Sequence, residues 1–138
     1  MSFFKKNKGK KIPKKQWKIT KDCLNLILES SKDSYPNEFG ALLRVDDSNK
    51  NIISELVLLP GTVSGDSHAI FRMHMRPIDF SIVGTVHSHP SFSSEPSRAD
   101  LELFSKYGKV HIIAANPYSV SSWKGYDYNG NQVEIKLI

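Results

Sequence analysis

The chain has 138 residues, of which 39% are hydrophobic and 24% are charged. A chain of this size folds as one domain that buries roughly two-thirds of its unfolded surface. No hydrophobic run approaches the roughly 20 residues that span a bilayer, and no hydrophobic stretch of a secretory signal follows the lysines near the N-terminus. We therefore expect a cytoplasmic domain with no membrane partner.

The net charge of +5 is unevenly distributed. Seven lysines lie in the first fifteen residues, so the rest of the chain has a net charge of −2. We expect residues 1–16 to form a flexible basic tail and residues 17–138 to form the folded domain. The tail is interpreted either as a solvated segment that aids solubility or as a weak contact to nucleic acid. A lysine run without aromatic residues carries no sequence readout, so nucleic acid is not the expected partner.

Hydrophobic spacing predicts a helix and then strands in the first half of the domain. Helical spacing over 19–28, with a cap at Thr20, predicts a helix that ends near Ser31. The single cysteine, Cys23, falls in this helix and is interpreted as a small buried side chain or, alternatively, as a reactive thiol. Strands are expected at 39–45, 52–59, 69–75 and 80–89, with a polar turn at 46–51 and a loop at 61–68.

The second half of the domain begins with a predicted helix at 97–107 that ends at Gly108. Strands are expected at 110–115 and 119–126. Asn129-Gly130 is typical of a hairpin turn and predicts a returning strand over 133–137. The whole pattern predicts an α/β or α+β domain of about six or seven strands and two main helices.

Two histidines end the hydrophobic strand at 80–89. His87 and His89 lie two residues apart, so their side chains point to the same face of the strand. Imidazoles in this arrangement suit zinc. Asp100, in the first turn of the next helix, would supply a third ligand and leave the fourth tetrahedral position open for water. Zinc lowers the pKa of such a water to about 7, so we expect one catalytic Zn²⁺ per chain.

Each of these residues also has a structural interpretation. A histidine on a strand often does no more than complete local hydrogen bonds. Ser97-x-x-Asp100 fits the capping box of a helix start, in which both side chains bond backbone N–H groups. Spacing alone does not separate ligand from cap. His111 is expected to be a structural strand residue and Glu95 a loop charge, while Ser88 points to the opposite face from the histidines and is no candidate nucleophile.

The pattern resembles the JAMM signature of the JAB1/MPN metalloproteases. Its matching positions are His87, His89, Pro90, Ser97 and Asp100. Glu38, within the segment 36–43, matches the place of the glutamate that the family has upstream, at the start of its first strand. The resemblance covers most of residues 18–138 and leaves out the basic tail.

This resemblance implies an MPN/JAB1 fold, similar to that of cytidine deaminase, with a curved mixed β-sheet and two main helices. It implies that His87, His89 and Asp100 bind Zn²⁺. It further implies that Glu38 holds the attacking water, takes its proton and passes it to the leaving amine, and that Ser97 donates a hydrogen bond to the oxyanion.

The resemblance also implies a substrate class. The expected activity is that of a metallo-isopeptidase acting on amide bonds formed by the Gly-Gly tail of a ubiquitin-like modifier. Trimming of the C-terminal tail of a ubiquitin-like sulfur-carrier protein is an alternative that uses the same residues. Two other classes stay open: a non-catalytic MPN scaffold module, and an iron oxygenase, because two histidines and a carboxylate also describe that iron site. The sequence does not indicate an oligomeric state.

Overall fold

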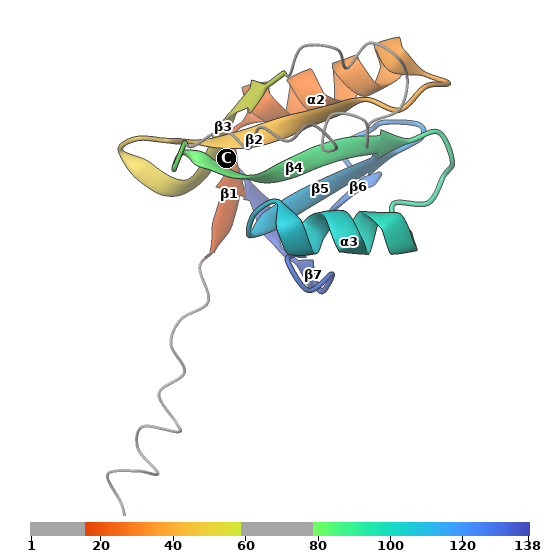
Figure 1. The fold of residues 1–138 in the computed structure, drawn as a ribbon. Helices are drawn as coiled ribbons and strands as arrows, with labels where there is room; N and C mark the ends of the chain where they lie inside the picture. Colours follow the sequence, from red (N-terminus) through yellow and green to blue (C-terminus); the bar gives the residue numbers. More distant parts are fainter. Residues whose placement is uncertain (1–15, 59–78) are drawn as a thin grey trace, which may run out of the picture.

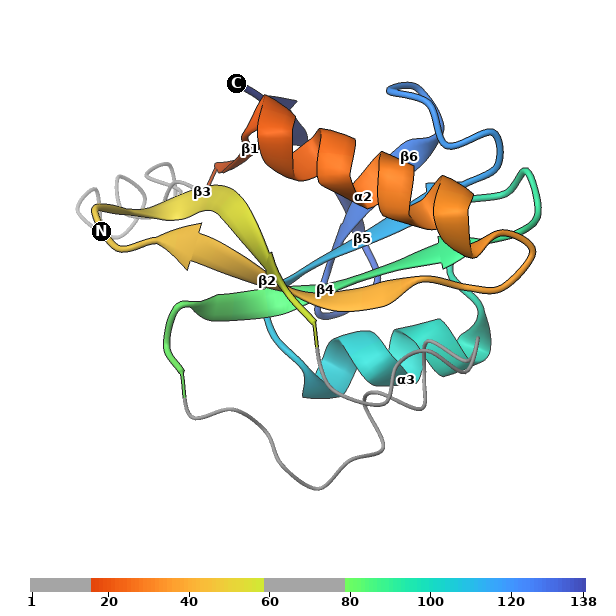
Figure 2. The same cartoon turned by 90° about the horizontal axis from the view of Figure 1, so that it is seen from above.

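The computed structural model describes residues 16–58 and 79–138. In these parts of the chain, eight strands form one curved mixed sheet in the order β7-β6-β5-β4-β2-β3-β1-β8, and two helices cover its opposite faces (Figures 1 and 2). The strands are β1 (Trp17–Ile19), β2 (Gly40–Asp46), β3 (Asn49–Val57), β4 (Ile82–His89), β5 (Val110–Ala115), β6 (Trp123–Asp127), β7 (Gln132–Val133) and β8 (Ile135–Leu137). The helices are α2 (Lys21–Ser34) and α3 (Arg98–Lys106). The predicted α+β fold is confirmed, and neither of these helices is long and apolar enough to cross a membrane.

Helix α2 covers one face of the sheet and begins at the predicted cap. The Thr20 hydroxyl accepts a hydrogen bond from the backbone N–H of Cys23 at 3.2 Å, which satisfies one of the free donors of the first turn. The buried stripe of the helix consists of Cys23, Leu24, Ile27, Leu28 and Ser31. Burial, with a smaller contribution from the charge of Glu55, raises the pKa of the Cys23 thiol to about 12. The thiol therefore stays protonated, as expected of a small core residue.

Three neighbouring strands, β2, β4 and β5, form the centre of the sheet and position the histidines. Strand β2 pairs antiparallel with β4, with Gly40 opposite His87, and β4 pairs in parallel with β5. Helix α3 makes the crossover between β4 and β5. Gly108 follows the end of the helix, with a φ of +121° that is accessible to glycine, and a Cβ atom there would lie 2.4 Å from the Val83 carbonyl oxygen.

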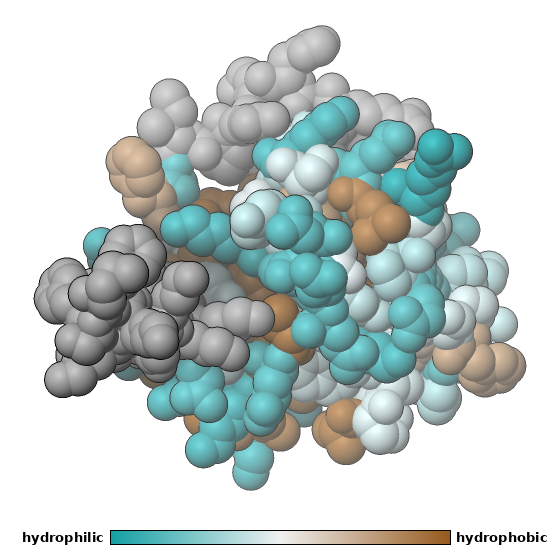
Figure 3. All heavy atoms as spheres, turned by 90° about the horizontal axis from the view of Figure 1, so that it is seen from below, coloured by the Kyte–Doolittle hydropathy of each residue, from teal (hydrophilic) through white to brown (hydrophobic). Residues whose placement is uncertain are grey.

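The hydrophobic core lies on both faces of the sheet. The larger part is between the sheet and α2 and includes Ile19, Leu24, Ile27, Val86 and Ile112. On the α3 side, Leu42 packs with Leu103, and Phe104 packs with Ile113 and Tyr126. Seen from the α3 side, the surface coloured by hydropathy is mainly hydrophilic, with hydrophobic atoms in separate small patches (Figure 3).

Several element boundaries differ from those expected from the sequence: α2 ends at Ser34 and not near Ser31, and β3 spans Asn49–Val57 and not 52–59. The sequence patterns do not predict strand β1 at residues 17–19, which pairs with β3 and β8. The strand expected from residue 119 begins at Trp123, because residues 119–122 form a turn closed by the Ser122 hydroxyl. The last strand expected at 133–137 is two short strands on opposite edges, β7 and β8. The loop expected at 61–68, the strand at 69–75 and nearly all of the basic tail lie outside the described residues.

Candidate metal centre

The C-terminal end of β4 presents the two histidines. His87 is fully buried, while the His89 side chain is 14% exposed. As predicted from their spacing, both rings lie on the same face of the strand, and their Nε2 atoms are 3.2 Å apart. The strand is buried along almost its entire length, so the histidine pair is held by a rigid element and not by a loop.

The start of α3 brings a carboxylate to the same point. Asp100 is 1% exposed, and its Oδ1 atom lies 3.0 Å from Nε2 of His87. Its Oδ2 atom lies 3.0 Å from Nε2 of His89 and also accepts a hydrogen bond from the backbone N–H of Ser97 at 2.9 Å. The Ser97 hydroxyl accepts from the N–H of Asp100 at 3.1 Å. The predicted capping box is therefore present, and the same carboxylate contacts both histidines.

A second carboxylate approaches from the start of β2. Ligand atoms of Glu38, His87 and His89 all lie within 4.8 Å of one another, and these are the types of side chain that hold metal ions. Glu38 lies two residues before Gly40, the first residue of β2 and the partner of His87. Glu38 is half-buried and Ser97 is exposed, so both lie toward solvent while His87 and Asp100 form the buried floor.

The ring of His89 is oriented by the loop that follows it. Nδ1 of His89 lies 2.9 Å from the Ser93 carbonyl oxygen, which only accepts, so Nδ1 carries a proton and the ring presents Nε2 toward Asp100 and His87. Burial lowers the pKa of His89, but the hydrogen bonds to Asp100 and to the Ser93 carbonyl outweigh burial and raise the pKa overall. This fixed orientation is typical of a metal-binding histidine.

His111 has a separate structural role, as the sequence predicts. It is fully buried, and its Nε2 lies 3.1 Å from the Phe104 carbonyl oxygen and 3.2 Å from that of Gly108. Because both are acceptors, Nε2 carries the proton, and Nδ1 accepts from the Thr85 hydroxyl at 2.7 Å. Both ring nitrogens are thus used within the fold. Burial lowers the pKa of His111 to about 4.

Two tyrosines and a serine form hydrogen bonds with the backbone near the histidines. Sequence patterns did not assign a role to any of the three. The Tyr118 hydroxyl donates to the His89 carbonyl oxygen at 3.0 Å, and the Tyr126 hydroxyl donates to that of Ser94 at 2.7 Å. The Ser88 hydroxyl accepts from the backbone N–H of Phe39 at 2.8 Å. Each bond joins a side chain to a distant backbone group, for which sequence spacing has no signal. Glu95 pairs with Lys124 at 2.7 Å on the surface, in line with its expected role as a loop charge.

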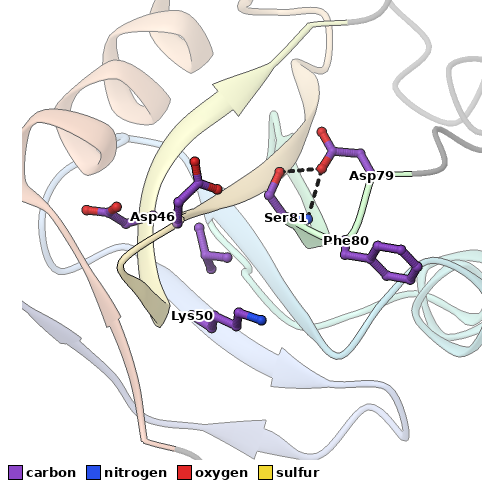
Figure 4. A pocket seen from close by; sticks show the side chains of 7 residues that line it. Asp46, Lys50, Asp79, Phe80 and Ser81 are labelled. Carbon is purple, nitrogen blue, oxygen red and sulfur yellow. Dashed lines mark hydrogen bonds between the residues drawn. The ribbon is translucent and has the colours of Figure 1, made fainter.

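The opposite end of β4 has a second polar cluster, around a hollow of about 330 Å³ (Figure 4). The carboxylates there serve local turns. Asp46 accepts from the backbone N–H and hydroxyl of Ser48, and Asp79 does the same for Ser81. Asp79 also accepts from Arg44 at 3.1 Å. These exposed groups are satisfied by their neighbours, so this cluster is not a candidate site.

Comparisons with known proteins agree with the fold. The profile of the family described as prokaryotic homologs of the JAB domain matches residues 20–126. A Haloferax volcanii protein named "Probable metalloprotease" is 35% identical over 127 residues, which cover 87% of this chain and 78% of the relative.

Two solved structures share both fold and sequence with this chain. A structure described as "JAMM: A Metalloprotease-like Zinc Site in the Proteasome and Signalosome" has a TM-score of 0.71 and 37% identity, covering 89% of this chain and 98% of its own. A JAB1/MPN domain protein from Archaeoglobus fulgidus has a TM-score of 0.70 and 37% identity, covering 89% of this chain and 97% of its own. The chain therefore belongs to the prokaryotic JAB family, with the MPN fold, and is a metalloprotease of the JAMM type.

Proposed function

We propose that this protein is a zinc-dependent isopeptidase that hydrolyses amide bonds at the C-terminus of ubiquitin-like modifier proteins. One observation carries the catalytic part of this proposal: the side chains of His87, His89 and Asp100 converge at the end of β4, with Glu38 beside them. The substrate class rests on the resemblance to the JAMM pattern.

The donor atoms fit a zinc ion. The Nε2 atoms of His87 and His89 are 3.2 Å apart, and each lies 3.0 Å from an oxygen of Asp100. A tetrahedral zinc site with bonds of about 2.0–2.1 Å has donor atoms about 3.3 Å apart, which is close to this spacing. Two imidazoles and one carboxylate are a common catalytic zinc set, so we assign His87, His89 and Asp100 as the ligands. Glu38 is the carboxylate nearer to solvent, and we assign it to the reacting water.

When bound, zinc supplies Lewis-acid polarisation of the scissile carbonyl and lowers the pKa of a coordinated water. Glu38 accepts the proton of the attacking water and transfers it to the leaving amine, which avoids expelling an unprotonated amine. The Ser97 oxygen already accepts a bond from the N–H of Asp100, so its own hydroxyl proton is available to the oxyanion. Asp100 and the histidines hold their positions because the strand and the helix start fix their backbones.

The exposed side of the site favours a narrow substrate segment. His87 and Asp100 are buried, so a scissile bond approaches over Glu38 and Ser97. An extended Gly-Gly tail has no side chains and permits a close approach of its backbone to this mouth. Such a tail is also able to bind beside a sheet edge as an added strand. These features support the tail of a ubiquitin-like protein as substrate.

A cleavage assay with three substrates tests the proposal. The substrates are a modifier linked to a lysine side chain, a modifier fused linearly to a second protein, and a sulfur-carrier protein with an extended tail. We expect cleavage of the lysine-linked modifier, loss of cleavage with a chelator and recovery with added zinc. If the protein prefers the sulfur-carrier protein with an extended tail, the proposed activity would be tail trimming and not isopeptide hydrolysis. No cleavage of any substrate by zinc-loaded protein, or iron with oxygen-dependent turnover, would contradict the proposed activity.

The role of Glu38 is tested by Glu38→Gln. This change keeps the shape of the side chain and removes the proton acceptor, so we expect zinc content to be unchanged and kcat to fall by roughly 10²–10⁴-fold. Glu95→Gln is the matched control, because Glu95 is an exposed glutamate that pairs with Lys124. We expect that control to keep wild-type activity. A Glu38→Gln variant with near wild-type kcat would show that another group is the general base.

A further inference from the structure

Ser88 lies between the two histidines and makes an irregular contact with the start of β2. Its backbone N–H donates to the Phe39 carbonyl oxygen at 2.9 Å, as in an antiparallel ladder. The return bond is different, because the N–H of Phe39 donates to the Ser88 hydroxyl oxygen at 2.8 Å. In a regular hydrogen-bonded pair that acceptor would be the backbone carbonyl oxygen of the opposite residue. The hydroxyl therefore takes the place of a main-chain acceptor where the ladder ends.

This bond acts on the peptide unit that joins Glu38 to Phe39. The N–H of Phe39 and the carbonyl of Glu38 belong to one planar group, so anchoring the N–H restricts the ψ angle of Glu38. Glu38 and Phe39 precede Gly40, the first residue of β2, so the chain at Glu38 is outside the strand. The backbone of Glu38 is consequently oriented by a side chain of β4.

We propose that Ser88 is a positioning residue that holds Glu38 at its working distance from His87 and His89. This inference rests on the proposed role of Glu38 as general base. The hydroxyl that orients Glu38 comes from the residue between the two histidines, so one strand segment presents both rings and fixes the carboxylate that faces them. Ser88 is fully buried, and its hydroxyl oxygen bonds Phe39, so it does not contact substrate.

A purely structural role for Ser88 would have different consequences. If its hydroxyl only satisfied the buried N–H of Phe39, removal would lower the free energy of unfolding and leave the catalysis of the folded protein unchanged. A positioning role affects the catalytic step, because a base displaced by a fraction of an ångström no longer lies within hydrogen-bond reach of the reacting water. The two roles are therefore separable in folded, zinc-loaded protein.

The test compares Ser88→Ala, Ser88→Thr and Ser31→Ala in zinc-loaded full-length protein. Ser88→Ala removes the hydroxyl, and we expect kcat to fall by roughly 10- to 100-fold with KM and zinc content unchanged. Ser88→Thr keeps a hydroxyl at this position, and we expect it to restore most of the lost kcat. Ser31 is the matched control: it is equally buried, and its hydroxyl donates to the Ile27 carbonyl oxygen at 2.7 Å in α2, so Ser31→Ala should keep wild-type kcat.

Two measurements need no substrate. Amide hydrogen exchange of Phe39 should be faster in Ser88→Ala than in wild type and should return to slow exchange in Ser88→Thr. Crystal structures of the zinc-loaded wild type and Ser88→Ala should show the Glu38 carboxylate moved away from the histidines in the variant.

Several results would overturn the positioning role. These are a wild-type kcat in Ser88→Ala, loss of zinc in that variant, an unmoved Glu38 carboxylate, or a Ser88→Thr variant that protects the Phe39 amide yet turns over as slowly as Ser88→Ala. Failure of the wild type to cleave any ubiquitin-like substrate would count against the proposed function alone, because exchange and the position of Glu38 would still decide the role of Ser88.

Discussion

The two ends of strand β4 both gather charged side chains, and they differ in what those side chains do. At the beginning of the strand, Arg44 reaches Asp79 at 3.1 Å and Glu55 at 3.4 Å, with all three side chains more than a third exposed. At the other end, His87 and Asp100 lie 3.0 Å apart and almost fully buried. Exposed charges of this kind contribute little, whereas buried charged groups are costly and are retained where they are paired or hold a metal.

The contacts of Asp79 show the same contrast. At the beginning of β4, hydrogen bonds from the hydroxyl and N–H of Ser81, followed by smaller contributions from Arg44, lower the pKa of Asp79. Its partners are those of a turn and a surface ion pair. At the other end the histidines and the carboxylate point at a common centre. Convergence together with burial, and not the number of charges, distinguishes the metal centre.

The largest expected effect is that of Asp100→Ala. If Asp100 is a ligand, the variant loses zinc and cleavage activity together. If Asp100 only caps α3, the loss is about 1 kcal/mol of stability with zinc retained. Thr20→Ala is the control for capping alone, because Thr20 caps α2 on the other face of the sheet. Metal analysis after dialysis, with urea unfolding of both variants, separates the two roles, and full zinc content in Asp100→Ala would remove it from the ligand set.

The next effect concerns Ser97. Ser97→Ala removes the hydroxyl that we assign to the oxyanion, and we expect kcat to fall by roughly 10²–10³-fold with zinc retained. It also removes a helix cap, which costs about 1 kcal/mol of stability. Ser97→Thr keeps both the hydroxyl and the cap and should retain most of the activity. Equal kcat values for Ser97→Ala and wild type would leave Ser97 with the capping role only.

Local patterns in the sequence predict most of what builds the site. The alternation of side chains along β4 places His87 and His89 together, and the capping pattern predicts the start of α3 at Ser97. Strand β5 has the predicted boundaries. These features depend on residues that are close in the chain, so spacing is enough to find them.

Features that depend on distant pairing were not predictable from spacing. Strand β1 depends on pairing with β3 and β8, which lie far from it in the chain, and the spacing of its three residues does not predict it. Glu38 could be selected only through the family resemblance, because its contact with His87 depends on the pairing of β2 with β4. Ser88 was set aside because it points away from the histidines, and that orientation is what lets it bond Phe39.

The next, smaller effect concerns His111, a histidine that is buried but does not point toward the metal centre. His111 is as buried as His87, but the groups that face it are the Thr85 hydroxyl and the carbonyls of Phe104 and Gly108. Burial lowers its pKa to about 4 in the folded protein, against about 6.5 in the unfolded chain. The unfolded chain therefore binds more protons below pH 6.5, so this histidine's contribution to stability is lost as the pH falls from 6.5 toward 4.

We expect His111 to lower the free energy of unfolding by about 2 kcal/mol between pH 7 and pH 5. An NMR titration of its imidazole should show a neutral ring down to about pH 4. Titration of that ring near pH 6.5 would contradict the buried neutral state.

The smallest expected effect is at the beginning of β4. Arg44→Ala removes the cation shared by Glu55 and Asp79, and all three side chains are partly exposed, so solvent replaces the lost contacts. We expect kcat, zinc content and metal affinity to equal those of wild type, with a small decrease in the melting temperature. Cleavage assays and zinc titration check this expectation. A fall in kcat comparable to that of Ser97→Ala would mean that the two ends of β4 are coupled and that burial and convergence alone do not define the site.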